Sequence, residues 1–174
     1  MIFRETPLRG AYLIEPERME DPRGFFARSW CQREFAERGL CDQFTQCNIS
    51  FNHKAGTVRG MHYQAAPHAE TKLVRCTAGA IYDVIVDMRP VSPTYRQWFA
   101  AELSAENRQM LYIPEEFAHG FQTLTDQSEV FYQMSHEFHA SSSRGFRWND
   151  EKIGISWPSP VTVIGDKDQN WPAL

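Results

Sequence analysis

The chain has 174 residues, 42% of them hydrophobic, and its charged residues of both signs sum to a net charge of −4. This length suffices for one well-filled hydrophobic core and is too short for two ordinary domains, so we predict one domain over residues 1–174. The mixed, weakly negative charge argues against a nucleic-acid-binding surface and against a basic face that is drawn to a membrane.

The N-terminal stretch MIFRETPLRGAYLIEPERME contains Arg and Glu where a signal peptide requires an unbroken apolar segment. No later run approaches the roughly 18 apolar residues of a membrane span. The four cysteines, at positions 31, 41, 47 and 76, show neither Cys-x-x-Cys spacing nor the density of a disulfide framework. We therefore expect a soluble, cytoplasmic protein with reduced thiols and without nucleic-acid or membrane partners.

The clearest helix candidate is CQREFAERGL, residues 31–40. Phe35 and Leu40 share a face at helical spacing, and Gly39 stands near the end of the segment, where helices commonly stop. The segment is short, so we expect a peripheral helix.

Strand patterns dominate the rest of the chain. The run KLVRCTAGAIYDVIVDM, residues 72–88, predicts two strands that are separated by a turn at Gly79. Further strand patterns, with turn residues between them, are QWFAAEL (97–103), QMLYI (109–113), GFQTLT (120–125), SEVFYQMS (128–135) and VTVIG (161–165). Many short strands at regular spacing predict a mainly β sandwich or barrel. The tail at 166–174, with its aspartates and a Trp, is expected to dock on it in part.

The stretch TVRGMHYQAAPHAETKLVRC, residues 57–76, concentrates ionisable groups among strand-like apolar residues. Small β-barrels often hold a metal through a His-x-His pair, a nearby Glu and a distant His. Here the corresponding residues are His62, Gln64, Glu70 and His119, and Gln is a poor ligand for most transition metals. We therefore predict no bound metal and no other cofactor.

The same stretch also fits an acid/base site. Alternate residues of a strand share a face, so His62 and Gln64 point one way, and Lys72 on the next strand can face the same cavity. An imidazole is suited to removing a proton near neutral pH, and an ammonium group beside it stabilises an oxyanion. This pairing suits proton abstraction next to a carbonyl. A structural histidine and a solvated lysine remain the alternative at this point.

Seven runs, spread over nearly the whole chain and in the same order, resemble the dTDP-4-dehydrorhamnose 3,5-epimerase family. They are DPRGFFARSW (21–30), RGMHYQ (59–64), KLVRC (72–76), YDVIVDMR (82–89), LSAENRQMLYIPEEFAHGF (103–121), RGFRWND (144–150) and ISWP (155–158). The resemblance implies a mainly β, cupin-type jelly-roll barrel with a few short peripheral helices, working without metal. It also implies a nucleotide-diphosphate-sugar substrate and a homodimer with exchanged N-terminal strands.

The resemblance also implies catalytic roles. His62 resembles the general base that takes the proton beside the C4 ketone, and Asp168 resembles the carboxylate that pairs with it, with Asp166 as the second candidate. Lys72 resembles the residue that stabilises the enolate oxygen, and Tyr132 resembles the acid that returns a proton on the opposite face.

Other positions resemble substrate contacts. Arg23 and Phe25 resemble residues that a neighbouring subunit contributes, and Arg59 resembles a diphosphate ligand, for which its guanidinium fork is well suited. Asp83 resembles a residue that supports the site from behind. The polar lining is expected to comprise Gln46, Asn48 and His119.

The sequence departs from the family pattern beside these positions. Glu137 and Phe138 stand where two adjacent tyrosines near the nucleoside are usual. Phe138 can still stack on a base, but the hydroxyl contacts are lost. Glu70 and Thr71 replace a Gln-Gly pair before the lysine. The identity of the nucleotide, dTDP, CDP or GDP, therefore stays open.

The sequence predicts an isomerase that epimerises a nucleotide-linked 4-keto-6-deoxy sugar in deoxysugar biosynthesis, at C3, C5 or both. The alternatives are an epimerase of a single carbon acting on another sugar nucleotide, a metal-dependent cupin enzyme, and a non-catalytic sugar-binding module. The joint presence of a base, an acid and a cation argues against a module that only binds.

Overall fold

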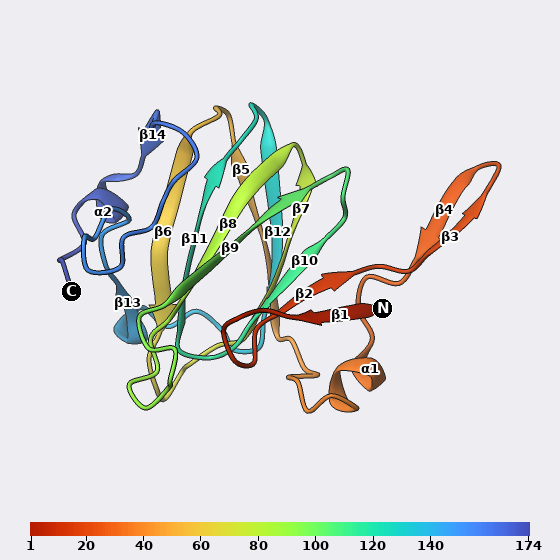
Figure 1. Cartoon of the computed structure of the whole chain (residues 1–174), viewed down its shortest axis with the longest axis horizontal. Coiled ribbons are helices and arrows are strands. Elements are labelled where there is room, and N and C mark those ends of the chain that lie inside the picture. The colour runs from red at the N-terminus through yellow and green to blue at the C-terminus, as the bar shows by residue number, and fades with distance from the viewer.

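A computed structural model describes all residues, 1–174, and consists of two facing β-sheets with a projecting hairpin and short helices (Figure 1). The first sheet contains, in spatial order, β1 (Ile2–Glu5), β2 (Tyr12–Glu15), β10 (Met110–Ile113), β7 (Lys72–Ala78), β12 (Ser128–Met134) and β5 (Gln46–Asn52). The second contains β13 (Ser143–Gly145), β6 (Thr57–Gln64), β11 (Phe117–Thr123), β8 (Ala80–Asp87) and β9 (Trp98–Ser104). β14 (Val163–Ile164) runs parallel to β6, and all other pairs are antiparallel. The mainly β, cupin-type prediction is confirmed.

The turn between β7 and β8 carries the chain from one sheet to the other. Gly79 adopts a φ of +69°, and a Cβ at this position would collide with Thr125 and Ser128. A residue with a side chain is strained in this conformation, so the glycine is required here. The strands on either side of it lie where the sequence predicts them.

The main core lies between the two sheets. It contains buried residues of both sheets, among them Val74, Ile81, Ile85, Leu111, Phe117, Phe121 and Val130. Burying each such side chain contributes about 1.5–3 kcal/mol.

The sequence of β8 is a nearly continuous apolar run because the other face of this strand is also covered. Val84 and Val86 pack under Phe146 and Ile153 of the C-terminal region.

The two predicted peripheral features are both present, and the helix is shorter than predicted. α1 spans Gln32–Ala36, and its Phe35 is completely buried. Gly39 has a φ of +66°, so the chain has already left the helix there. The C-terminal tail forms α2 (Asp166–Gln169) and places Trp171 against Gly145, where a Cβ would lie 2.6 Å from the indole ring. The tail therefore docks, as predicted.

All four cysteines are free thiols, as predicted. None of the helices has both the length and the apolar character that a membrane crossing demands.

The hairpin of β3 (Arg18–Asp21) and β4 (Gly24–Ala27) extends away from the two sheets, on the side opposite α2 (Figure 1). The sequence analysis did not predict these strands, whose first member reads Arg-Met-Glu-Asp. The hairpin exposes three large apolar side chains, with exposed fractions of 61% for Met19, 40% for Phe25 and 67% for Phe26. An apolar element that projects into solvent in one chain is typical of a surface that another chain covers.

A buried carboxylate fixes the loop between β8 and β9. Asp87 is completely buried and accepts hydrogen bonds from the Arg89 guanidinium and from the hydroxyls of Ser92 and Thr94. Burial alone would raise the pKa of Asp87, but these hydrogen bonds outweigh it and lower the pKa from 3.8 to about 2. The ionised form is therefore the one that stabilises the fold.

We expect Asp87→Asn to lower the free energy of unfolding at neutral pH by about 2 kcal/mol, the equivalent of this pKa shift. Because the folded-state pKa lies below the unfolded one, the wild-type advantage is complete above the unfolded value and shrinks as the pH falls toward about 2. Urea unfolding at several pH values measures it. Glu106→Gln, a change at an exposed acid, is the control. Equal stability of the two variants at neutral pH would contradict the assignment.

Candidate active site

Two adjoining cavities open between the sheets. The larger, of about 520 Å³, is lined by six of the predicted site residues: Arg59, His62, Lys72, His119, Tyr132 and Asp168. The smaller, of about 320 Å³, is lined by three others: Gln46, Asn48 and Phe138. His62, Lys72 and Tyr132 line both cavities. These three side chains therefore stand where the two cavities meet, and His62 and Lys72 face one cavity as strand alternation predicts.

His62 of β6 is hydrogen-bonded to Asp168 of α2. The distance between His62 Nε2 and Asp168 Oδ1 is 2.6 Å, and the second carboxylate oxygen accepts a hydrogen bond from the backbone N–H of Gly60 at 3.2 Å. A carboxylate partner fixes Nε2 as the protonated nitrogen and leaves Nδ1 of the neutral ring with a free lone pair. Asp166, the second candidate, is exposed at the start of α2 and does not bond to His62.

The pKa of Asp168 reflects two opposing effects. Asp168 is only 8% exposed, and burial would raise its pKa. The hydrogen bond and the charge of His62, together with the Gly60 N–H, outweigh burial and hold the pKa below its usual value. Asp168 is therefore ionised near neutral pH, so it can orient His62 and stabilise the imidazolium that forms when His62 takes a proton.

Close contact between β6 and β11 positions this pair. A Cβ on Gly60, whose φ is +134°, would lie 2.6 Å from the Cα of Gly120. Only residues without side chains allow the two strands to come this close. A register shift follows His119 at this point, and His119 lies directly opposite His62. The glycines thus place two histidines side by side at the cavity.

Lys72 is paired with Glu70. The two side chains lie 2.8 Å apart and are both buried, with exposed fractions of 8% for Lys72 and 5% for Glu70. The partner balances the buried charge of Lys72, since an unpaired ammonium group in the interior is costly. The other oxygen of Glu70 has no protein partner. Glu70 thus contacts an ammonium group, and His119 Nε2 donates a hydrogen bond to the Asp83 carboxylate at 2.7 Å. These two candidate metal ligands are therefore engaged by other residues.

Tyr132 of β12 has a hydroxyl without a protein hydrogen-bond partner, and its side chain lines both cavities. Burial raises the pKa of Tyr132, and the positive charge of Arg59 opposes this only in part. The phenol is therefore protonated near neutral pH, the form that can donate a proton.

A cationic rim borders the larger cavity. Arg59 is exposed, and its Nε donates to the Asn52 side chain at 2.8 Å, which holds the guanidinium in place. Lys167 of α2 lines the same cavity, with its ammonium group 5.3 Å from the centre of the Trp171 ring. Two cations at one opening suit a ligand with negatively charged phosphates.

The sequence analysis missed several lining residues. Lys167, between Asp166 and Asp168 in the sequence, lines the larger cavity. Ser50 and Phe51 of β5 also line the larger cavity. Strand alternation gives a signal for Ser50, because Gln46, Asn48 and Ser50 follow one another on the same face of β5.

Three predicted residues do not line either cavity. Asp83 is completely buried and supports His119 from behind. Arg23 pairs with Asp21 at the tip of the hairpin, and Phe25 lies under the Arg18 guanidinium, 4.9 Å from it. Within one chain, the structure does not bring Arg23 and Phe25 to the site.

Comparisons with known proteins identify the family of the chain. Residues 5–174 match the family model described as dTDP-4-dehydrorhamnose 3,5-epimerase. The chain is 43% identical to the dTDP-4-dehydrorhamnose 3,5-epimerase of Salmonella typhimurium, over 100% of this chain and 96% of that protein. It is 42% identical to the Sinorhizobium fredii protein of the same name, over 100% of this chain and 90% of that one.

A solved structure is similarly close. The crystal structure of the dTDP-4-dehydrorhamnose 3,5-epimerase of Bacillus anthracis, with TDP and PPi bound, superposes with a TM-score of 0.94 at 42% identity. The alignment covers 99% of each chain. The family model and these relatives extend over essentially the whole chain, so the resemblance in the sequence is confirmed. The chain belongs to the dTDP-4-dehydrorhamnose 3,5-epimerase family of isomerases.

Proposed function

We propose that this chain epimerises a dTDP-linked 4-keto-6-deoxy sugar at C3 and C5, in the biosynthesis of a deoxysugar. The observation that carries the proposal is the position of His62, Lys72 and Tyr132 where two cavities meet, with Asp168 hydrogen-bonded to His62. Family membership supports the choice of dTDP and of both carbons.

Each inversion is a proton exchange at a carbon next to the ketone. His62 removes the proton, and the electrons of the broken C–H bond move into the carbonyl group to give an enolate. Lys72 stabilises the enolate oxygen, which carries more charge in the transition state than in the bound ketone. Tyr132 then donates its phenolic proton to the same carbon from the opposite face. His62 and Tyr132 regain their starting protonation states from water, and no redox change occurs.

The remaining site residues hold the substrate. Arg59 and Lys167, which line the same cavity, bind the diphosphate through charge-assisted hydrogen bonds. Gln46 and Asn48 supply hydrogen bonds to polar groups of the substrate. They lie two residues apart on β5, and Gln46 Nε2 donates to Asn48 Oδ1 at 3.0 Å.

Two aromatic side chains complete the site. His119, which is hydrogen-bonded to Asp83, forms part of the polar lining. Phe138, at the edge of the smaller cavity, offers an aromatic face on which a base can stack.

The proposal includes a homodimer that exchanges its N-terminal strands. The exposed apolar residues of the β3–β4 hairpin need a cover, and the edge strand β5 exposes Ile49 (64%) and Phe51 (42%), which also line the larger cavity. The hairpin of a second copy, laid beside β5, would bury both apolar surfaces and bring the partner's Arg23 and Phe25 to the cavity. Location in the cytoplasm, where nucleotide sugars are made, is part of the same proposal.

The function is tested by proton NMR in D₂O. We expect the chelator-treated protein to introduce deuterium at C3 and C5 of a dTDP-linked 4-keto-6-deoxy sugar, because both protons are exchanged through the enolate. CDP- and GDP-linked analogues are the controls for the nucleotide. Binding without any deuterium uptake would contradict the proposal and favour a sugar-binding module. Uptake that requires added metal would favour a metal-dependent enzyme.

The division of roles between His62 and Tyr132 predicts different defects. We expect His62→Ala to abolish both proton exchange and inversion, with a loss of about 10²–10⁴-fold in kcat, the usual contribution of a general base. Tyr132→Phe keeps the base and the ring, so it retains exchange while inversion falls. NMR in D₂O measures both quantities on one sample. Equal loss of exchange in the two variants would overturn this division.

The assignment of Asp168 is tested against its neighbour. We expect Asp168→Asn to lower kcat by at least about 10²-fold, because an amide does not stabilise the imidazolium as a carboxylate does. Asp166→Asn removes the same charge two residues away and serves as the matched control, with expected activity close to wild type. A larger loss in the Asp166 variant would transfer the role to Asp166.

A further inference from the structure

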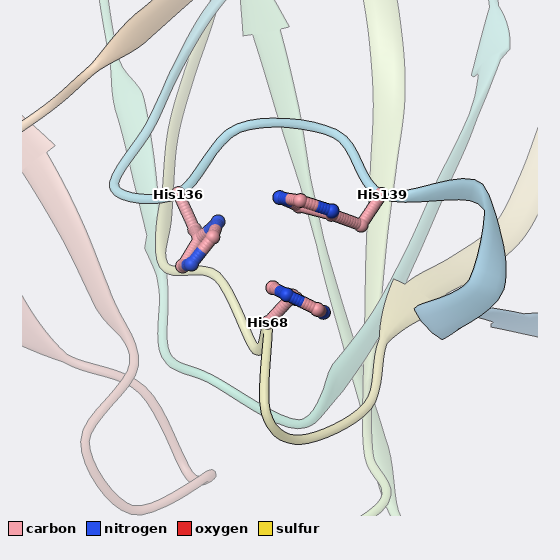
Figure 2. A group of neighbouring side chains, drawn as sticks. All are labelled: His68, His136 and His139. Atoms are coloured by element: carbon pink, nitrogen blue, oxygen red, sulfur yellow. The ribbon is translucent and has the colours of Figure 1, made fainter.

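Three histidines outside the proposed active site form a cluster on the surface. His68 follows β6, and His136 and His139 lie between β12 and the short helix η1 (Ala140–Ser142). Figure 2 shows the three side chains gathered between these two loops. One ring nitrogen of each lies within 4.8 Å of the corresponding nitrogens of the other two. Half of the six histidines of the chain therefore meet at one place.

Gln64 holds the two loops together. Its side chain is buried, with an exposed fraction of 3% for the residue. Nε2 donates to the backbone carbonyls of His68, at 2.9 Å, and Glu137, at 3.1 Å. Oε1 accepts a hydrogen bond from the backbone N–H of His139. One buried amide thus joins the backbone of both loops, so the histidines are brought together by the fold and not by chance overlap of mobile side chains. Gln64 is also the residue that replaces a histidine in the interior metal pattern considered above.

Two of the rings are oriented by partners on one nitrogen. Nδ1 of His68 is 2.8 Å from the Ser142 hydroxyl, and Nδ1 of His136 is 3.2 Å from the Glu137 carbonyl. Such contacts fix the ring and leave Nε2 as the available ligand atom, as is usual for histidines that bind metals. The His139 ring has no protein hydrogen-bond partner, so both of its nitrogens are available.

The cluster can close around an ion by a small movement. The rings of His68 and His139 are stacked with centroids 3.7 Å apart, and the His136 ring lies 5.1 Å and 5.2 Å from them. Zn–N bonds of about 2.0–2.1 Å bring tetrahedral ligand atoms to about 3.4 Å from one another. Turning the His139 ring out of its stack with His68 would direct one of its nitrogens toward the other two histidines.

We propose that His68, His136 and His139 form a binding site for a divalent transition metal, with Zn²⁺ or Ni²⁺ as the fitting ions. Neutral imidazole nitrogens suit these ions, and three protein ligands leave the fourth position open to water. The ion would join the loop after β6 to the loop after β12 at the surface, apart from the cavity residues that carry the proposed chemistry.

A bound ion would affect the smaller cavity. Phe138, which lines that cavity and is 55% exposed, lies in the sequence between two of the proposed ligands. Fixing His136 and His139 restrains the Phe138 backbone between them. This consequence rests on the proposed function: if Phe138 stacks on the nucleoside base, the metal changes the KM for the nucleotide sugar and leaves kcat nearly unchanged.

The site is tested by calorimetric titration of Zn²⁺, and separately of Ni²⁺, into the chelator-treated full chain. We expect one ion per chain, and a fall in affinity of at least about tenfold for His136→Ala and for His139→Ala, as for other losses at metal sites. His53→Ala removes an exposed histidine elsewhere and is the matched control, with unchanged affinity. The circular dichroism spectrum checks that each variant is folded.

Three results would overturn the proposal. The wild type could bind neither ion, all variants could bind the ion with the affinity of the wild type, or His53→Ala could lose as much affinity as the variants at His136 and His139. Because titration measures binding without any substrate, failure of the metal site is distinguishable from failure of the proposed epimerase activity. A KM that responds to Zn²⁺ in the wild type and not in His139→Ala would connect the ion to the smaller cavity. A KM that does not respond would contradict that consequence while leaving the binding result unaffected.

Discussion

The hydrogen bond between His62 and Asp168 is the contact on which the arrangement of the site depends. It joins residues that are 106 positions apart, one on β6 and one on α2 near the end of the chain. The C-terminal segment runs parallel to β6 as β14 and continues into α2, and Trp171 packs against Gly145. The last residues of the chain are therefore part of the site, and their docking keeps the carboxylate buried and ionised beside the imidazole.

Pairing of charges explains how so many ionisable groups are accommodated between two sheets. Lys72 is balanced by Glu70, and His119 contacts Asp83. A buried charge without a partner costs several kcal/mol, so each of these pairs makes its polar residue compatible with the interior. Tyr132 differs, because its hydroxyl has no protein partner and is available to a ligand. The site thus combines groups that are fixed by neighbours with one group that is left available for proton transfer.

Much of this could be predicted from the sequence, and the failures have physical reasons. Strand alternation placed His62 and Lys72 on one cavity, and the glycine between β7 and β8 marked the turn between the sheets. The β3–β4 hairpin was missed because its charged first strand lacks a buried face within its own chain. The histidine cluster was missed because its members are brought together by a buried amide from another strand, and local spacing carries no signal of such a contact. The family resemblance already favoured Asp168 over Asp166, and the geometry of α2 supports this preference, because Asp168 is buried beside His62 and Asp166 is exposed.

In the proposed reaction, the sugar ring lies between a base and an acid where the two cavities meet. The most direct test is a crystal structure of the protein with a dTDP-linked 4-keto sugar bound. We expect His62 and Tyr132 to face opposite sides of the ring and the ketone oxygen to lie within hydrogen-bond distance of Lys72. A sugar bound outside the cavities, or with both side chains on the same face of the ring, would contradict it.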